Sequence, residues 1–321
     1  MECSTRGFAL TDVKPAPPEL EQIDKDVYVD ETEGLVIESR SFGRQTWLRF
    51  RHHRLAVAGG IVLIVLALAF IVGPMLSPYA YDEVLAGPPR ESPTLDHPFG
   101  TDDIGRDMMT RTFVAGRFSL RIAITVALLT TLIGTVIGAA AGYFGGWVDS
   151  FLSQVINLFL ILPALVLLLV VGVKWGADPD TMAILIAFIL WPPVARIVRG
   201  LTIQYKEQEF VMAARAAGAG PRRILVRHII PNTFGPIIVA ATLLVGIAII
   251  LESTLSFLGV GVQLPTPTLG NMVNEAKGYI DTAPYRILIP GGFVVLIVLC
   301  INYLGDGLRD ALDPTSAKVR E

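Results

Sequence analysis

The sequence is poor in charge and in cysteine. Only 17% of its 321 residues are charged, 52% are hydrophobic, and the mean hydropathy is +0.57. This composition excludes an ordinary soluble domain and is typical of a polytopic helical membrane protein. The two cysteines, Cys3 and Cys300, are too few and too far apart to indicate a disulfide framework or a metal site.

Motifs for nucleotide binding and for covalent chemistry are also lacking. Without a G-x-x-x-x-G-K-[ST] phosphate loop, the chain cannot cradle ATP in the usual way. A membrane hydrolase would need a nucleophile–base set or an H-E-x-x-H motif, and neither is present. An ion-driven transporter would need paired charges or broken helices in two repeated halves, whereas only Glu252 is a candidate and no repeat is visible. We therefore expect a chain that is not an enzyme.

The N-terminal segment lacks an apolar run. Residues 1–39 carry ten Asp and Glu against three Lys and Arg, and residues 40–54 then carry five Arg, two His and no acid. We expect residues 1–48 to be an acidic, mostly disordered tail with a basic juxtamembrane end, and we expect no cleaved signal peptide.

Apolar runs of membrane length occur six times, which predicts an all-α polytopic protein with six transmembrane helices. The predicted spans are Leu55–Leu76, Leu120–Ala141, Leu152–Val173, Met182–Val198, Phe234–Leu255 and Ile287–Leu304. We divide the chain into the tail 1–48, the first span with an extracytoplasmic loop at 49–116, a core of five spans at 117–314 and a C-terminal tail at 315–321.

Basic residues predict the orientation. Four arginines precede the first span, and the segment 199–232 carries six Lys and Arg, whereas the segment 77–116 carries three Arg against seven acids. By the positive-inside rule, the chain is a multi-pass protein of the cytoplasmic membrane with both termini and the segment 199–232 in the cytoplasm.

Glycine and proline residues interrupt the apolar side chains of the second and fourth predicted spans. Gly134, Gly138 and Gly142 recur at spacing four, which predicts a helix face for close packing, either within the chain or on a partner subunit. Pro192 and Pro193 are expected to kink or end the fourth span because two amide donors are missing.

The basic segment 208–232, QEFVMAARAAGAGPRRILVRHIIPN, predicts two short helices between two spans. Gly218 suits the end of the first helix, Pro221 suits the start of the second, and Pro231 is expected to end it. Either the segment rests on anionic lipid headgroups or it docks into a groove of a protein partner, which its Ala and Gly spacing favours.

Two further groups of polar residues are candidate sites. In the extracytoplasmic loop they form a metal site, a loop held by ion pairs, or a surface for a partner: His97, Gly100, Asp102, Asp103, Gly105, Arg106 and Asp107. In the fifth span, Glu252, Ser253 and Ser256 are candidates for the translocation path, because an intramembrane carboxylate is costly unless it is paired or faces water. The alternative for Glu252 is a helix-end residue bonded to serine or backbone.

Five motifs in order resemble the C-type permease of the oligopeptide/dipeptide/nickel group of ATP-binding-cassette importers. The resemblance runs from about Arg49 to Pro314 and rests on HPFGTDDIGRDMMTR (97–111), GYFGGWVDSFL (142–152), A-A-x-x-A-G (213–218) followed by H-I-I-P-N (228–232), ESTLSFLGVGVQLPTPTLGNM (252–272) and NYLGDGLRDALDP (302–314). It implies a type I importer permease fold that imports oligopeptides or dipeptides, or alternatively nickel or a small solute such as glutathione.

The resemblance also implies the partners. These are a homologous B-type permease, two ATPase subunits that bind ATP and Mg, an extracytoplasmic binding protein and membrane lipids, but no nucleic acid. The segment 199–232 would dock on an ATPase, and its candidate residues are Glu209, Met212, Ala213, Ala214, Arg215, Ala217, Gly218, Arg222, Arg223, His228 and Pro231. Met212 stands where the family has a glutamate, and Glu209, three residues earlier, is a possible substitute on the same helix face.

Overall fold

The computed structural model describes residues 29–30, 34–35, 42–175 and 178–312. The predicted acidic tail therefore lies largely outside the described residues, and the C-terminal tail 315–321 lies wholly outside them. The chain forms two compact units, residues 1–47 and 48–321. In the first unit, strands β1 (Val29–Asp30) and β2 (Gly34–Leu35) pair antiparallel. Helix α1 (Phe42–His52) begins there.

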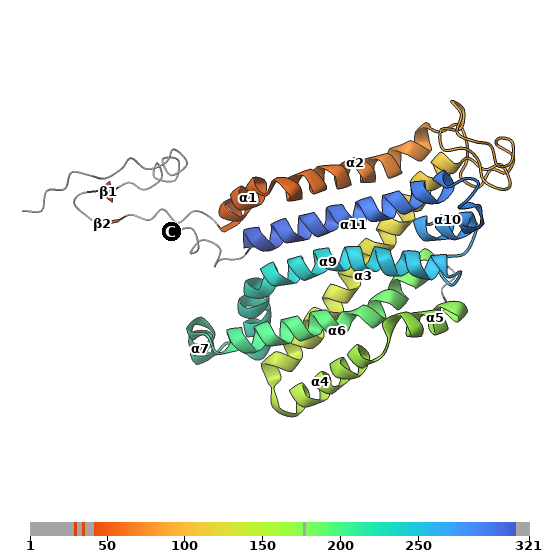
Figure 1. The fold of residues 1–321 in the computed structure, drawn as a ribbon. Helices are drawn as coiled ribbons and strands as arrows, with labels where there is room; N and C mark the ends of the chain where they lie inside the picture. The colour runs from red at the N-terminus through yellow and green to blue at the C-terminus, as the bar shows by residue number, and fades with distance from the viewer. Residues whose placement is uncertain (1–28, 31–33, 36–41, 176–177, 313–321) are drawn as a thin grey trace, which may run out of the picture. The chain divides into compact units, whose positions relative to one another are not determined.

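The second unit is helical. Figure 1 shows α2, α11, α9 and α6 side by side in this order, with α3 crossing them and with α7 and α10 at opposite ends of the bundle. The elements are α2 (Arg54–Leu76), α3 (Met108–Phe144), α4 (Gly146–Ile161), α5 (Ala164–Trp175), α6 (Pro179–Lys206), α7 (Glu209–Ala216), α8 (Pro221–Ile224), the π-helical turn η2 (Leu225–Ile229), α9 (Ile230–Phe257), α10 (Leu269–Ala276), the 3-10 turn η3 (Lys277–Tyr279) and α11 (Tyr285–Leu312).

Five helical segments of the described chain are long and apolar enough to cross a membrane: 54–76, 108–144, 179–206, 221–257 and 285–312. The predicted span Leu152–Val173 is not one straight helix, because α4 and α5 meet at 83° and count as a sixth span only together. The cause is Pro163, which lacks an amide donor and moves Leu162 out of the helical region to φ −70° and ψ 132°.

The other spans are longer than predicted because helices continue past their apolar stretch. The division at 116/117 consequently falls inside α3, and the segment 199–232 begins inside α6 and ends inside α9. The helix α6 likewise does not end at Pro192 and Pro193 but continues to Lys206.

Close packing of α3 against α6 explains the three glycines. A Cβ on Gly138 would lie 2.3 Å from the carbonyl oxygen of Ala195, and a Cβ on Gly142 would lie 2.7 Å from that of Arg199. A Cβ on Gly134 would lie 2.6 Å from Cβ of Val194. The glycine face therefore packs within the chain, as one of the two alternatives predicted.

The main hydrophobic core lies between α2, α3, α6, α9 and α11. Side chains from all five helices meet in one cluster, and because lipid tails are as apolar as these side chains, close van der Waals packing rather than removal from water stabilises it. Its fully buried members include Phe70, Ile122, Met182, Ile186, Ile249, Leu255 and Ile297.

Gly138→Ala tests the helix contact. The new methyl group overlaps the Ala195 carbonyl, so we expect a loss of about 1–3 kcal/mol and a lower melting temperature in detergent. Gly200→Ala on α6 is the matched control, because no atom lies within 4 Å of its Cβ position. Equal melting temperatures for the two variants would contradict the proposed packing.

Candidate functional site

The basic segment between α6 and α9 folds as two short helices, α7 and α8, as predicted. Gly218 adopts φ +83° after α7, where its amide donates to the Arg215 carbonyl and the Ala219 amide donates to the Ala214 carbonyl. These two bonds form a Schellman cap, which requires a residue in the left-handed region.

The helix α7 is held by one side chain and exposes most of the others. Val211 is fully buried against Tyr143, Ile224 and Ile229. Phe210 and Met212 are 41% and 48% exposed, and among the predicted positions Glu209, Ala213, Arg215, Ala217 and Gly218 are also exposed, whereas Ala214 is half-buried. Small and apolar side chains that are exposed on a short, rigidly capped helix suit a protein groove better than water.

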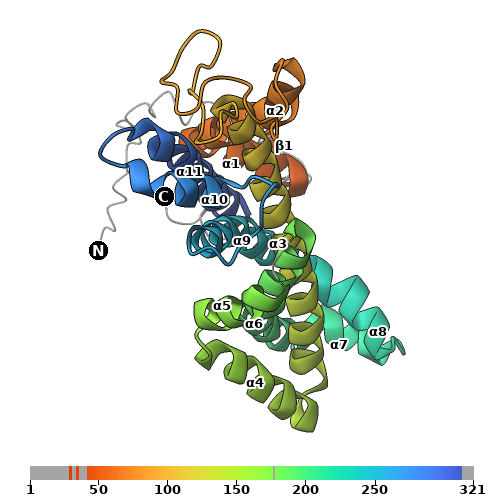
Figure 2. The same ribbon diagram turned by 90° about the vertical axis from the view of Figure 1, so that its right-hand side faces the viewer.

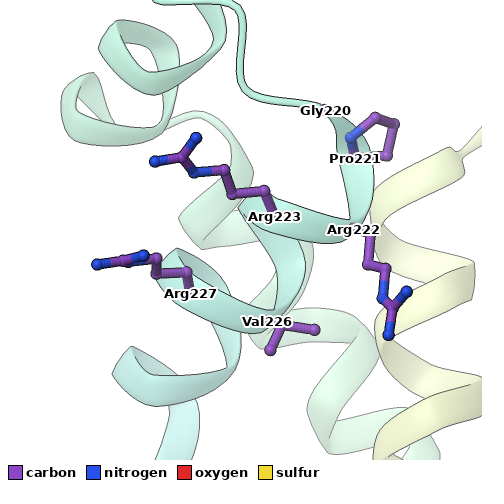
Figure 3. Close-up of a pocket in the computed structure, with 6 residues that line it drawn as sticks. All are labelled: Gly220, Pro221, Arg222, Arg223, Val226 and Arg227. Atoms are coloured by element: carbon purple, nitrogen blue, oxygen red, sulfur yellow. The ribbon is translucent and has the colours of Figure 1, made fainter.

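Arginines surround a shallow hollow beside α8. Figure 3 shows Arg223 and Arg227 extending to one side of the helix and Arg222 to the other. In the described part of the chain, no carboxylate forms an ion pair with these three guanidinium groups. The guanidinium groups around this hollow therefore place uncompensated positive charge beside α8, next to α7.

Pro231 does not end the second helix, contrary to the prediction. The Ile230 amide donates to the Leu225 carbonyl, five residues back, so the chain passes through the π-helical turn η2 into α9. Pro231 lies in the first turn of α9, where its missing donor is tolerated. His228 is half-buried in η2, and its carbonyl accepts a bond from the Asn232 side chain.

Met212 and Glu209 lie on the exposed part of α7. Glu209 is in the first turn, where the helix dipole favours a carboxylate. None of the ion pairs and side-chain hydrogen bonds between described residues involves it. Its carboxylate is free to contact another molecule. It lies, however, three residues before Met212, the position at which the family has a glutamate.

Buried ion pairs hold the loop 77–107 at the other end of the bundle. Asp102 accepts bonds from the amides of Ile104 and Arg106 and pairs with the side chains of Arg106 and Arg111. Glu275 also pairs with Arg111, at 3.0 Å, and thereby ties the loop to α10. Gly100 and Gly105 adopt positive φ, where a Cβ would meet the neighbouring backbone.

Asp103 and Asp107 have separate roles in this loop. Asp107 caps α3 through the Thr110 amide and accepts from His97, whose Nδ1 lies 3.0 Å away. Asp103 contacts Arg90, Arg286 and the hydroxyl of Tyr279. Each of the three carboxylates thus has basic or backbone partners, which matches the ion-pair alternative for this loop.

Glu252 is fully buried and joins three helices. Its carboxylate accepts from Ser119 on α3 at 3.1 Å and from Ser256 on α9 at 2.8 Å. Ser256 in turn accepts from Thr268, which caps α10. Glu252 and Ser256 therefore lie inside the bundle, and of the three candidates only Ser253 borders a hollow, between α9, α10 and α11.

The sequence did not point to several partners in these networks. Four of them come from segments far along the chain from the residues that they contact: Ser119, Glu275, Tyr279 and Arg286. Only the cost of an unpaired buried charge indicates that such partners exist, and it does not identify them.

Asp102→Asn tests the ion pairs of the loop. Burial alone would raise the pKa of Asp102, but the amide of Arg106, the charge of Arg111 and further hydrogen bonds outweigh it, so the pKa lies below its ordinary value. The stabilisation is therefore present above about pH 4 and is lost as the pH falls through the lowered pKa.

We expect Asp102→Asn to cost about 3 kcal/mol at pH 7 and to flatten the acid dependence of the melting temperature below about pH 4. Asp82→Asn, an exposed carboxylate in the same loop, is the control. The same acid dependence in the Asp102 variant and the wild type would refute the role of this pair.

Comparison with known proteins agrees with this architecture. Residues 134–318 match the family described as "Binding-protein-dependent transport system inner membrane component", and residues 41–93 match the "N-terminal TM domain of oligopeptide transport permease C". One solved structure, "Inward facing conformations of the MetNI methionine ABC transporter", shares the fold with a TM-score of 0.54 and 19% identity. The similarity covers 64% of this chain and 98% of that chain.

Curated relatives are similar over most of their length. The "Oligopeptide transport system permease protein OppC" of Escherichia coli (strain K12) is 41% identical over 88% of this chain and 94% of its own. The "Dipeptide transport system permease protein DppC" of Alkalihalophilus pseudofirmus is 38% identical over 84% of this chain and 89% of its own. The chain belongs to the family of inner-membrane permease components of binding-protein-dependent ATP-binding-cassette importers.

Proposed function

We propose that this permease subunit forms half of the translocation pathway for oligopeptides or dipeptides. The observation that carries the proposal is 41% identity to an oligopeptide permease across 88% of the chain, together with the match of residues 41–93 to the N-terminal domain of that permease type. The other half would be a homologous B-type permease, and an extracytoplasmic protein would deliver the peptide.

The proposed orientation places α7, α8 and both termini in the cytoplasm. The uncompensated arginines near α8 lie at one end of the bundle, and the loop 77–107, rich in carboxylates, lies at the other (Figure 1). This distribution of charge supports the orientation that the positive-inside rule predicts.

The exposed face of α7 and the arginine hollow would contact one of two ATPase subunits, which bind ATP and Mg. Closure of the ATPases would move this segment, and the movement would bias the permeases between inward-open and outward-open states. The exposed Phe210 and Met212 supply apolar contact area, and Arg222, Arg223 and Arg227 supply charge for an acidic rim. Lipid headgroups and the partner permease would contact the remaining exposed surface.

Uptake by the reconstituted complex tests the function. Proteoliposomes that hold this chain, its B-type partner and the ATPases, supplied with the binding protein, should accumulate a labelled tripeptide when ATP is present and not with a non-hydrolysable analogue. Accumulation of nickel or glutathione, without peptide, would contradict the proposed substrate.

Gly218→Val tests the coupling contact. Valine at φ +83° strains the cap by about 1–3 kcal/mol, so we expect α7 to tilt or fray and peptide uptake per ATP hydrolysed to fall several-fold. Gly220→Ala is the matched control, since its φ is −73° and no atom lies within 4 Å of its Cβ position. Wild-type coupling in the Gly218 variant would count against docking through α7.

A further inference from the structure

An arginine lies inside the apolar length of α6. Arg196 is about 26 Å along the helix from Pro179 and about 15 Å from Lys206, at about 1.5 Å per residue. It lies two residues before the end of the predicted span Met182–Val198, near the proposed cytoplasmic end of the apolar stretch. A charge within a span is costly unless it reaches the interface, is paired or faces water, so its surroundings are informative.

Arg196 has no counter-charge in the described part of the chain. Its Nη2 donates to the side-chain oxygen of Asn157 on α4, at 2.9 Å, and the side chain is exposed. Arg199, one turn away, differs because two of its nitrogens contact both carboxylate oxygens of Asp149, at 2.5 and 2.7 Å. Arg199 is neutralised within the chain, whereas Arg196 keeps a full positive charge at the surface of the bundle.

The helix α4 adds further polar groups beside this charge. Ser150, Gln154 and Asn157 follow one another at spacings of four and three residues, which places them along one side of the helix, and all three are exposed. Asn157 lies eight residues after Asp149 in α4, so the stripe extends about 12 Å from the Asp149–Arg199 pair toward the bend at Pro163.

This polar side of α4 does not result from packing inside the chain. The buried side of α4 is apolar, with Ile156 against Trp191 and Ala195 of α6. Figures 1 and 2 show α4 at the edge of the bundle, next to α6. The Ser150 hydroxyl donates to the Gly146 carbonyl of its own helix, but acyl chains cannot satisfy the guanidinium of Arg196 or the amides of Gln154 and Asn157, so these groups meet water, substrate or polar protein.

We propose that the polar face formed by Arg196, Asn157, Gln154 and Ser150 lines the transport route and binds the C-terminal carboxylate of the peptide through Arg196. The inference rests on the proposed peptide transport. Serine and amide side chains can exchange bonds with peptide groups of any sequence, and one uncompensated guanidinium matches the single carboxylate that every linear peptide carries.

A partner permease is the less favoured occupant. It would need a buried carboxylate opposite Arg196 and further polar groups opposite Ser150 and Gln154, and ion pairs buried between subunits seldom repay their desolvation. A passing peptide instead meets the arginine in a hydrated route, where transient charge-assisted bonds form and break.

The test compares Arg196→Gln, Arg196→Lys and wild type in the full complex. Uptake of a labelled tripeptide with a free C-terminus is measured against uptake of the same peptide as its amide, with the same binding protein throughout. We expect wild type to favour the free peptide, and we expect Arg196→Gln to lower that preference roughly tenfold. Arg196→Lys should keep most of it.

Arg121→Gln is the matched control, an exposed arginine on α3 whose partner is Asp180. It should retain the wild-type preference, and every variant should keep the partner permease and basal ATP hydrolysis. Loss of the partner on Arg196→Gln would assign Arg196 to the subunit contact and overturn the proposal, as would an unchanged ratio of free to amidated peptide. A wild-type complex that imports no peptide would instead refute the proposed function itself, which distinguishes the two failures.

Discussion

The close approach of α3 to α6 positions the parts of the molecule that matter for transport. Because Gly138 and Gly142 lack side chains, α6 packs directly against the backbone of α3 at these two positions. α4 follows α3 in the chain and packs on both helices, and α7 follows α6. The polar face of α4 and the exposed face of α7 therefore both depend on one helix contact, and a methyl group there disturbs both.

The two ends of the bundle are built differently. At the α10 end, Asp103 and Glu252 are bonded to partners from distant segments, Asp102 pairs with the nearby Arg111, and Arg111 and Arg286 tie the loop 77–107 to α10 and α11. At the α7 end, Val211 is the one fully buried side chain of the short helix, and the arginines around α8 have no carboxylate partners among the described residues. The first arrangement favours a rigid platform, and the second leaves contacts available for another subunit.

Local patterns predicted local structure well. The Gly218 cap and the face of Gly134, Gly138 and Gly142 follow from spacing within a few residues, and the structure has both. The bend at Pro163 was missed although its signal, a proline within an apolar run, was present. The bond from Ser256 to Glu252 agrees with the serine alternative predicted for Glu252, but the partner Ser119 was missed because it lies 133 residues away and periodicity carries no information at that range.

The turn at Leu225–Ile229 has a mechanical consequence. Helical structure is continuous from Pro221 to Phe257, 37 residues, so α8 joins α9 without a loop. A π-helical turn is a rare geometry that occurs mostly as a single turn inside a helix, often at functional sites. A force applied near Pro221 is therefore transmitted to α9, and toward the buried Glu252 near its far end, through continuous helical backbone that contains this turn.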